Sequence, residues 1–309
     1  IIHKLDDVLA IADRITVIRR GQVIETMSKE VATKERIAES MVGKPVLFKL
    51  ERHEVSAGGP VLALEEVTVR DEKGLPALSS VNLEVRAGEI HGIAGVEGNG
   101  QSELVRCIAE PVAHGEGRVL LDGVEIGDWD VRKRREGGIG HIPEDRQRFG
   151  LLLPFSIAEN LVLGRHHRPP FVNRIGAIRR SAIEEHANHA ISDYDIRTPS
   201  ASTPAHALSG GNQQKVIIAR EMNSEPRVLL AVQPTRGVDI GATEFIYRQI
   251  LAAKAAGKAV LLVSADLDEI LALSDRVSVL YRGRIVHELP ASEATKEKVG
   301  YYMLGGGAA

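Results

Sequence analysis

A short glycine-rich loop between a predicted buried strand and an apolar helix constrains this chain more than any other feature. Residues 89–94 predict the strand, residues 95–102 the loop and residues 102–109 the helix. The loop reads G-V-E-G-N-G-Q-S, which matches the phosphate-binding pattern G-x-x-x-x-G-K-[ST] except at the lysine, where Gln101 stands. The residues predicted to contact a phosphate are Gly95, Gly98, Asn99, Gly100, Gln101 and Ser102. A plain strand-to-helix turn is the alternative.

The missing lysine predicts weak rather than absent phosphate binding. A charge-assisted hydrogen bond is worth about 1.5–3 kcal/mol, and about 1.4 kcal/mol is tenfold in affinity. The backbone N–H groups and the helix N-terminus remain available.

The order of the other elements predicts a parallel sheet with crossover helices. Strands are expected at 61–69, 81–85, 139–142, 228–232 and 259–263, a hairpin turn at Asp122-Gly123, and helices at 213–222 and 243–255. Between Phe155 and Ala207 the pattern becomes helical, and Ser156 and Glu159 are spaced as a capping box. This stretch is interpreted as a helical insertion.

The two ends of the chain repeat each other. A shift of 262 residues, the separation of His3 and Ala265, aligns residues 1–43 with residues 263–305 without a gap. Both copies predict a helix (5–12 and 267–273), a strand, an Arg-Gly turn, a strand and a short helix. The repeat indicates two copies of one domain: residues 1–50 as the end of the first, 51–60 as a linker, and 61–309 as the second. Since the chain begins at Ile1 within that pattern, we interpret it as a fragment.

Composition excludes several classes of protein. The net charge of −3 argues against nucleic-acid binding, and the basic run 132–135 is flanked by acids, which favours a solvated surface. The single cysteine, Cys107, is expected to be a buried apolar residue. No apolar run reaches the roughly 18 residues of a membrane span. Adjacent His166 and His167 lack a third ligand at metal spacing, so no metal site is predicted.

The octapeptide L-S-G-G-N-Q-Q-K at 208–215 resembles the signature motif of ABC ATPases. With the phosphate loop, it implies an α/β, P-loop NTPase-type ABC cassette: a parallel sheet core with flanking helices, an antiparallel β subdomain, and a helical subdomain at about 151–207, before the signature. The nucleotide-binding residues implied here are Ser209, Gly210, Gly211 and Asn212. Asp239 matches the aspartate that communicates across the cassette dimer.

Other positions depart from the family pattern. Val232 and Gln233 stand where the family has a Mg²⁺-binding aspartate and a catalytic glutamate, and Ala265 replaces the switch histidine. His3, its repeat partner, keeps that histidine in the first copy. Glu144 occupies the place of a glutamine that couples to the membrane partner. The resemblance therefore implies a degenerate second cassette, with ATP and Mg²⁺ as family cofactors and little or no ATPase activity from this chain alone.

In ABC ATPases the signature of one cassette closes over the nucleotide held by the other. The resemblance to tandem subunits of simple-sugar and nucleoside importers implies two membrane permease subunits, a substrate-binding lipoprotein or periplasmic protein, and the first cassette of the same or another chain. It also implies a peripheral location at the cytoplasmic face of the membrane. Residues 144–163 are the expected permease contact.

Two alternatives stay open: a soluble, translation-associated tandem ABC protein without a permease, and a non-hydrolysing nucleotide-binding or interaction module. A competent enzyme that uses Gln101 in place of lysine is disfavoured by Val232 and Ala265. Asp266, Asp268 and Glu269 are interpreted as acids that stabilise a helix start.

Overall fold

The computed structural model describes residues 5–19, 21–43, 55–71, 73–111 and 114–307. Its elements follow the order expected from the sequence, and the predicted fold class is confirmed. Within the described ranges, no helix is both long and apolar enough to cross a bilayer.

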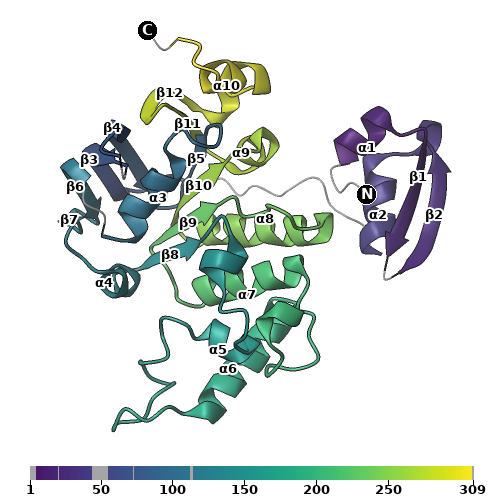
Figure 1. Ribbon diagram of the computed structural model, residues 1–309, viewed down its shortest axis with the longest axis horizontal. Coiled ribbons are helices and arrows are strands. Elements are labelled where there is room, and N and C mark those ends of the chain that lie inside the picture. The colour runs from purple at the N-terminus through teal and green to yellow at the C-terminus, as the bar shows by residue number, and fades with distance from the viewer. Residues whose placement is uncertain (1–4, 20, 44–54, 72, 112–113, 308–309) are drawn as a thin grey trace.

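The N-terminal unit, residues 5–43, contains two helices and a β-hairpin that repeat at the other end of the chain (Figure 1). Its elements are α1 (Leu5–Ile11), β1 (Arg14–Arg19), β2 (Gln22–Ser28) and α2 (Lys34–Val42). The matching elements are α9 (Leu267–Leu273), β11 (Arg276–Tyr281), β12 (Arg284–Pro290) and α10 (Lys296–Met303). Thr33 and Thr295 cap the last helix of each copy in the same way. The predicted pattern of elements in the repeat is thus confirmed.

A six-stranded sheet forms the centre of the larger unit, in the order β12-β11-β5-β10-β9-β8. Its remaining strands are β5 (Ile90–Ala94), β8 (Ile139–Ile142), β9 (Val228–Val232) and β10 (Ala259–Ser264). The strands are parallel except β12, which pairs antiparallel with β11. Side chains alternate between the two faces: Leu229 packs in one core cluster and Leu230 in the other. Both faces are buried, as in other parallel sheets.

Helices cover one face of this sheet and a second, antiparallel sheet lies beside the other (Figure 1). That second sheet has the order β4-β3-β6-β7, from β3 (Pro60–Arg70), β4 (Pro76–Arg86), β6 (His114–Leu121) and β7 (Val124–Glu125). The predicted hairpin turn is confirmed, because Asp122 and Gly123 both adopt positive φ, at 50° and 78°. Helix α3 (Gln101–Ala109) packs between the sheets, and Cys107 is buried in it as predicted.

The helical insertion lies at the bottom of Figure 1 and contains α5 (Ile157–Leu161) and α6 (Arg180–Asp193). Both hydrogen bonds of the Ser156–Glu159 capping box are present. The remaining helices are α4 (Val131–Glu136), α7 (Gly210–Met222) and α8 (Ile240–Ala255), with a π-helical turn η2 (Arg146–Gly150) and short 3₁₀ turns η1 (Lys29–Val31), η3 (Ala205–Ala207) and η4 (Ala291–Glu293). Helix α7 begins three residues before the predicted start, because the Ser209 side chain caps it.

The prediction that the basic run 132–135 is a solvated surface is wrong at Arg134, although Arg132 and Lys133 are exposed as expected. Arg134, in the basic run 132–135, is only 1% exposed. Its guanidinium donates to the carbonyl oxygens of Cys107, Ile108, Ile126, Gly127 and Trp129, at 2.8–3.0 Å. Two of these carbonyls end α3, so Arg134 joins that helix to the turn before α4. The charge is buried because every N–H of its fork finds a backbone acceptor.

Candidate functional site

The phosphate loop, residues 95–100, is held between β5 and α3 by backbone contacts. Gly98 and Gly100 adopt positive φ, and a Cβ at Gly100 would lie 2.7 Å from the carbonyl oxygen of Ala77. Asn99 ties the loop to the turn between β11 and β12: its Oδ1 accepts from the Arg282 N–H at 3.0 Å and its carbonyl from the Gly283 N–H at 2.8 Å. The loop therefore has the strand, turn and helix context that phosphate binding requires.

Gln101 folds back onto this loop. Its Oε1 accepts from the Asn99 N–H at 3.1 Å, and its Nε2 donates to the Val96 carbonyl at 2.8 Å. A Cβ at Gly95 would lie 2.4 Å from the same Nε2, so the amide covers the start of the loop. A loop N–H that can bind an anion is thus already paired with a neutral side chain.

A cavity of about 330 Å³ opens beside this loop. Its lining includes Gly98, Gln101, Ser102, Glu144, Val232 and Gln233. Val232 presents a hydrocarbon and Gln233 a neutral amide, so neither supplies the carboxylate on which Mg²⁺ sites are usually built. Glu97, also in the lining, pairs with Arg236 at 3.3 Å. In the ranges that the structure describes, no three His, Cys, Asp or Glu side chains group as a metal site would need.

The signature segment, residues 208–215, begins α7 at a separate place. Ser209 Oγ accepts from the Asn212 N–H at 3.5 Å and from Asn212 Nδ2 at 3.0 Å, while Asn212 Oδ1 accepts from the Arg197 N–H at 2.9 Å. Gly210 and Gly211 are closely packed: a Cβ at Gly211 would lie 3.0 Å from the Ala242 Cβ. Asp239 caps α8 next to them, accepting from the Ala242 N–H at 2.9 Å.

A second cavity, of about 650 Å³, separates the signature from the N-terminal unit. Ser209, Gly211, Asn212 and Asp239 line one side, and residues of β1, β2 and α2 line the other. The two units touch nearby, because α2 contacts α8 and Ile240 packs against the small core of the N-terminal unit. The predicted nucleotide-binding residues thus divide between two sites, and His3 lies outside the described residues.

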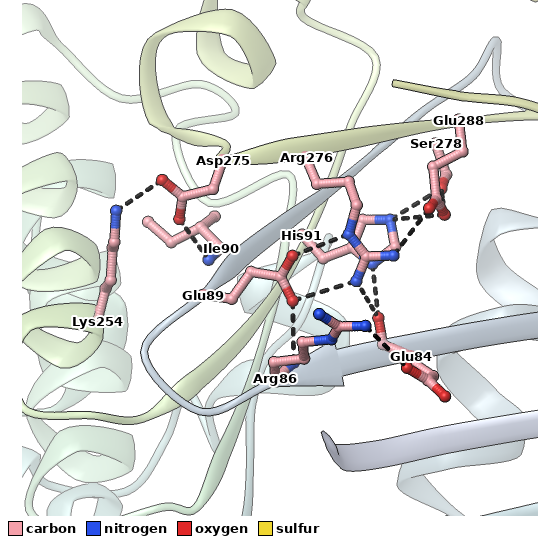
Figure 2. Close-up of polar contacts among 10 residues, drawn as sticks. All are labelled: Glu84, Arg86, Glu89, Ile90, His91, Lys254, Asp275, Arg276, Ser278 and Glu288. Atoms are coloured by element: carbon pink, nitrogen blue, oxygen red, sulfur yellow. Dashed lines mark hydrogen bonds and ion pairs between the residues drawn. The ribbon is translucent and has the colours of Figure 1, made fainter. Parts of the chain in front are cut away.

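A buried polar network supports β5, the strand that leads into the phosphate loop (Figure 2). Asp275 accepts from the Ile90 N–H at 2.9 Å and pairs with Lys254 at 2.6 Å. Arg276 binds Glu89 at 2.8 Å, and fully buried His91 contacts Ser278 Oγ at 2.8 Å. Burial lowers the pKa of His91. The sequence repeat could have identified Asp275 and Arg276 as structurally important, because Asp13 and Arg14 occupy the matching positions of the other copy.

Glu269 has a role that the sequence interpretation missed. Asp266 caps α9 as expected of an acid at a helix start, but Glu269 is 1% exposed and accepts from Thr235 Oγ1 at 2.7 Å. Burial raises the pKa of Glu269 from its ordinary value of 4.5 to about 7. This carboxyl joins α9 to the loop that follows β9.

This carboxyl predicts a pH-dependent difference between wild type and a Glu269→Gln variant. The folded protein keeps a proton on Glu269 between pH 4.5 and 7 that the unfolded chain releases. Its contribution to stability therefore falls as pH rises through that window, by about 3 kcal/mol in total. We expect Glu269→Gln to match wild type near pH 4.5 and to exceed it above pH 7 in urea unfolding. A constant difference across pH 4.5–8 would contradict this assignment.

Comparison with known proteins agrees with this geometry. Residues 78–236 match the family model described as ABC transporter. The chain is 43% identical over 295 residues to the guanosine import ATP-binding protein NupO of Bacillus subtilis, covering 96% of this chain and 58% of that protein. It is 41% identical over 306 residues to the nucleoside import ATP-binding protein NupA of Lactococcus lactis, covering 99% and 60%. A glucose import ATP-binding protein of Haloferax volcanii, TsgD13, is 41% identical over 309 residues, with 99% and 56% covered.

Among solved structures, the dimeric post-hydrolysis state of the ATP-binding cassette MJ0796, bound to ADP and Pi, superposes with a TM-score of 0.63. It is 27% identical, and the match covers 74% of this chain and 98% of that one. The ADP conformation of the cassette MJ1267, at 23% identity and a TM-score of 0.62, supports the fold alone. The chain spans 56–60% of the length of the curated relatives named above.

Proposed function

This chain belongs to the ABC transporter family of ATP-binding proteins, and from that premise we propose that it is part of the energy-coupling subunit of an importer for nucleosides or simple sugars. The names of its relatives support this substrate class, since they include guanosine, nucleoside and glucose import proteins. The observation that carries the proposal is the contrast between the two sites. The signature faces an open cavity, while the phosphate loop of the same cassette is covered by Gln101.

The subunit carries two cassettes in this proposal: residues 1–50 end the first, 51–60 link them, and 61–309 form the second, with a helical subdomain at about 151–207. The exposed fractions of apolar side chains in the N-terminal unit support its assignment as the end of a first cassette. Ile11 and Ile18 are 71% and 61% exposed, whereas their repeat partners Leu273 and Leu280 are fully buried. Strand β11 pairs with β12 on one side and with β5 on the other. Its repeat counterpart β1 pairs only with β2 in the part of the chain that the structure describes. A strand of the first cassette equivalent to β5 would complete that edge and cover both isoleucines.

The second cassette is degenerate in this proposal and binds ATP weakly. Gln101 supplies no positive charge, and Val232 and Gln233 offer neither a carboxylate for Mg²⁺ nor a base that can take a proton from water at neutral pH. Productive ATP and Mg²⁺ would be held by the first cassette, with Ser209–Asn212 closing over that nucleotide. His3 would serve the same composite site, and Asp239 would communicate between the cassettes.

The partners in this proposal are two membrane permease subunits and a substrate-binding lipoprotein or periplasmic protein. The proposed permease contact is Glu144–Leu163, which includes the exposed apolar side chains of Phe149, Leu152 and Phe155. The subunit would then lie at the cytoplasmic face of the membrane as a peripheral protein. Co-purification with ribosomes instead of membrane proteins would favour a translation-associated ABC protein.

A Gln101→Lys variant tests the proposal for the degenerate site. Lysine adds a charge and releases the Asn99 N–H, so we expect nucleotide affinity, measured by titration with a fluorescent ATP analogue, to rise about 10- to 100-fold. Gln101→Ala is the matched control: it frees the same N–H without adding charge, so its gain should be smaller. Steady-state ATP turnover by the unaltered chain should be negligible. Turnover comparable to an intact cassette, and abolished by changing Gln101, would overturn the proposal.

A further inference from the structure

Arg146 reaches from η2 to the loop that connects β9 to α8, here called the 234–239 loop. Its Nη1 donates to the carbonyl oxygen of Arg236 at 2.7 Å, and its Nη2 donates to that of Gly237 at 3.2 Å. Its Nε–H is buried and has no acceptor among the described residues. The guanidinium is therefore anchored by the 234–239 loop and not by its own turn.

The same guanidinium packs against the signature. A Cβ at Gly210 would lie 2.6 Å from Arg146 Nη2 and 3.3 Å from the Gly237 carbonyl oxygen, so only a glycine fits beside them without a shift. Two glutamines of α7 reinforce the arrangement: Gln213 Oε1 accepts from Gln147 Nε2 at 3.2 Å, and Gln214 Nε2 donates to the Pro234 carbonyl at 2.8 Å. Hydrogen bonds therefore join η2 to the 234–239 loop, η2 to α7, and α7 to the 234–239 loop.

The segment that carries Arg146 also borders the cavity at the phosphate loop. Glu144, Asp145, Arg148 and Phe149 line that cavity, while Arg146 faces the signature. Phe149 is 60% exposed, so the segment is open to an outside partner as well. A displacement of residues 144–149, by a partner or by a molecule in the cavity, would move the guanidinium and with it the first turn of α7.

We propose that Arg146 is a positioning residue that holds the signature and the 234–239 loop in register with the segment 144–149. This inference rests on the proposed function, in which the signature acts on ATP bound by the first cassette. In this role Arg146 acts through Gly210 and the 234–239 loop and does not itself touch the nucleotide. Arg146 fixes the positions of Gly210 and of the loop that leads to Asp239. A displacement of residues 144–149 would therefore change ATP hydrolysis at the composite site.

The test uses the full-length tandem protein with its permease subunits in proteoliposomes. ATP hydrolysis is measured with and without transported substrate for wild type, Arg146→Gln and Arg118→Gln. We expect Arg146→Gln to lower the substrate-stimulated kcat about tenfold or more while KM for ATP changes less than about twofold, because the signature is misplaced but the phosphate loop that binds ATP is intact. Arg118, whose side chain is 59% exposed in a surface ion pair with Glu65, is the matched control and should leave both parameters unchanged.

A purely structural role would lower the melting temperature without changing kcat per folded molecule. If Arg146→Gln does not fold, Arg146→Lys takes its place, because a lysine keeps the charge but its ammonium cannot bridge the two carbonyls in the same fork. We expect about a threefold or larger loss of stimulated kcat for Arg146→Lys. Wild-type kcat in a folded Arg146 variant, or a raised KM at unchanged kcat, overturns the inference. A Ser209→Ala variant in the same membranes separates the two proposals: if it also retains full hydrolysis, the composite site itself fails.

Discussion

Ser209→Ala in the full-length tandem protein is expected to lower kcat for ATP hydrolysis about 100-fold or more, the usual cost of losing one oriented donor to transition-state charge. Ser209 lines the 650 Å³ cavity at the start of α7, a position where backbone N–H groups of a helix can bind an anion. The effect would be large although Ser209 lies in the cassette whose own phosphate loop is impaired. Hydrolysis is measured as phosphate release at saturating ATP.

Loss of a helix cap must be separated from loss of a catalytic donor, since Ser209 also caps α7. Thr295→Ala is the matched control because Thr295 caps α10 through the Lys298 N–H at 3.2 Å, away from both cavities. Each variant should lose about 1 kcal/mol of stability, but only Ser209→Ala should lose hydrolysis. Gly210→Val should reproduce that loss, because its side chain would meet Arg146 and the Gly237 carbonyl. Unchanged hydrolysis in both the Ser209 and Gly210 variants would remove the argument for a composite site.

Local signals accounted for most of the fold. The Ser156–Glu159 box, the Asp122-Gly123 turn and the apolar runs of β9 and β10 each depend on neighbours in sequence, and each is found where it was expected. The repeat predicts the elements of the N-terminal unit, since β1 and β2 align with β11 and β12 and form the same antiparallel hairpin. The parallel arrangement of the central strands then followed from their alternation with helices.

The sequence predicts which segments form the candidate sites, but not the hydrogen bonds that their side chains make in the folded protein. The sequence pattern locates Gln101 in the phosphate loop, yet the amide's return to Val96 and Asn99 depends on the folded loop. In the sequence Glu269 is one of three acids at a helix start, and only its burial in the folded protein explains its raised pKa. The carbonyl acceptors of Arg146 lie about 90 residues away in sequence, so no local pattern predicts this contact. Such contacts carry no periodic signal.

Substitution of Arg134 is expected to cause a large loss of folding stability. We expect Arg134→Met to lower the free energy of unfolding by about 3–5 kcal/mol, because several buried carbonyl oxygens lose their donor and an unsatisfied buried group costs about 1–3 kcal/mol. The loss would leave the carbonyl oxygens of Cys107 and Ile108 at the end of α3 without this donor, and those of the turn before α4 as well. In a scan of thermal unfolding the midpoint should fall by roughly 10 °C.

Its neighbours in the run provide the control, and they also explain why the sequence interpretation failed there. Successive residues of a helix point about 100° apart, so four basic residues in a row cannot share one environment. Arg132 is 66% exposed and forms a surface ion pair with Glu136, so Arg132→Met should cost less than about 0.5 kcal/mol. Arg134→Lys should be intermediate, since an ammonium keeps the charge but cannot reach five carbonyls in one plane. Equal free energies of unfolding for the Arg132→Met and Arg134→Met variants would contradict this prediction. The five hydrogen bonds of Arg134 would then contribute nothing measurable to stability.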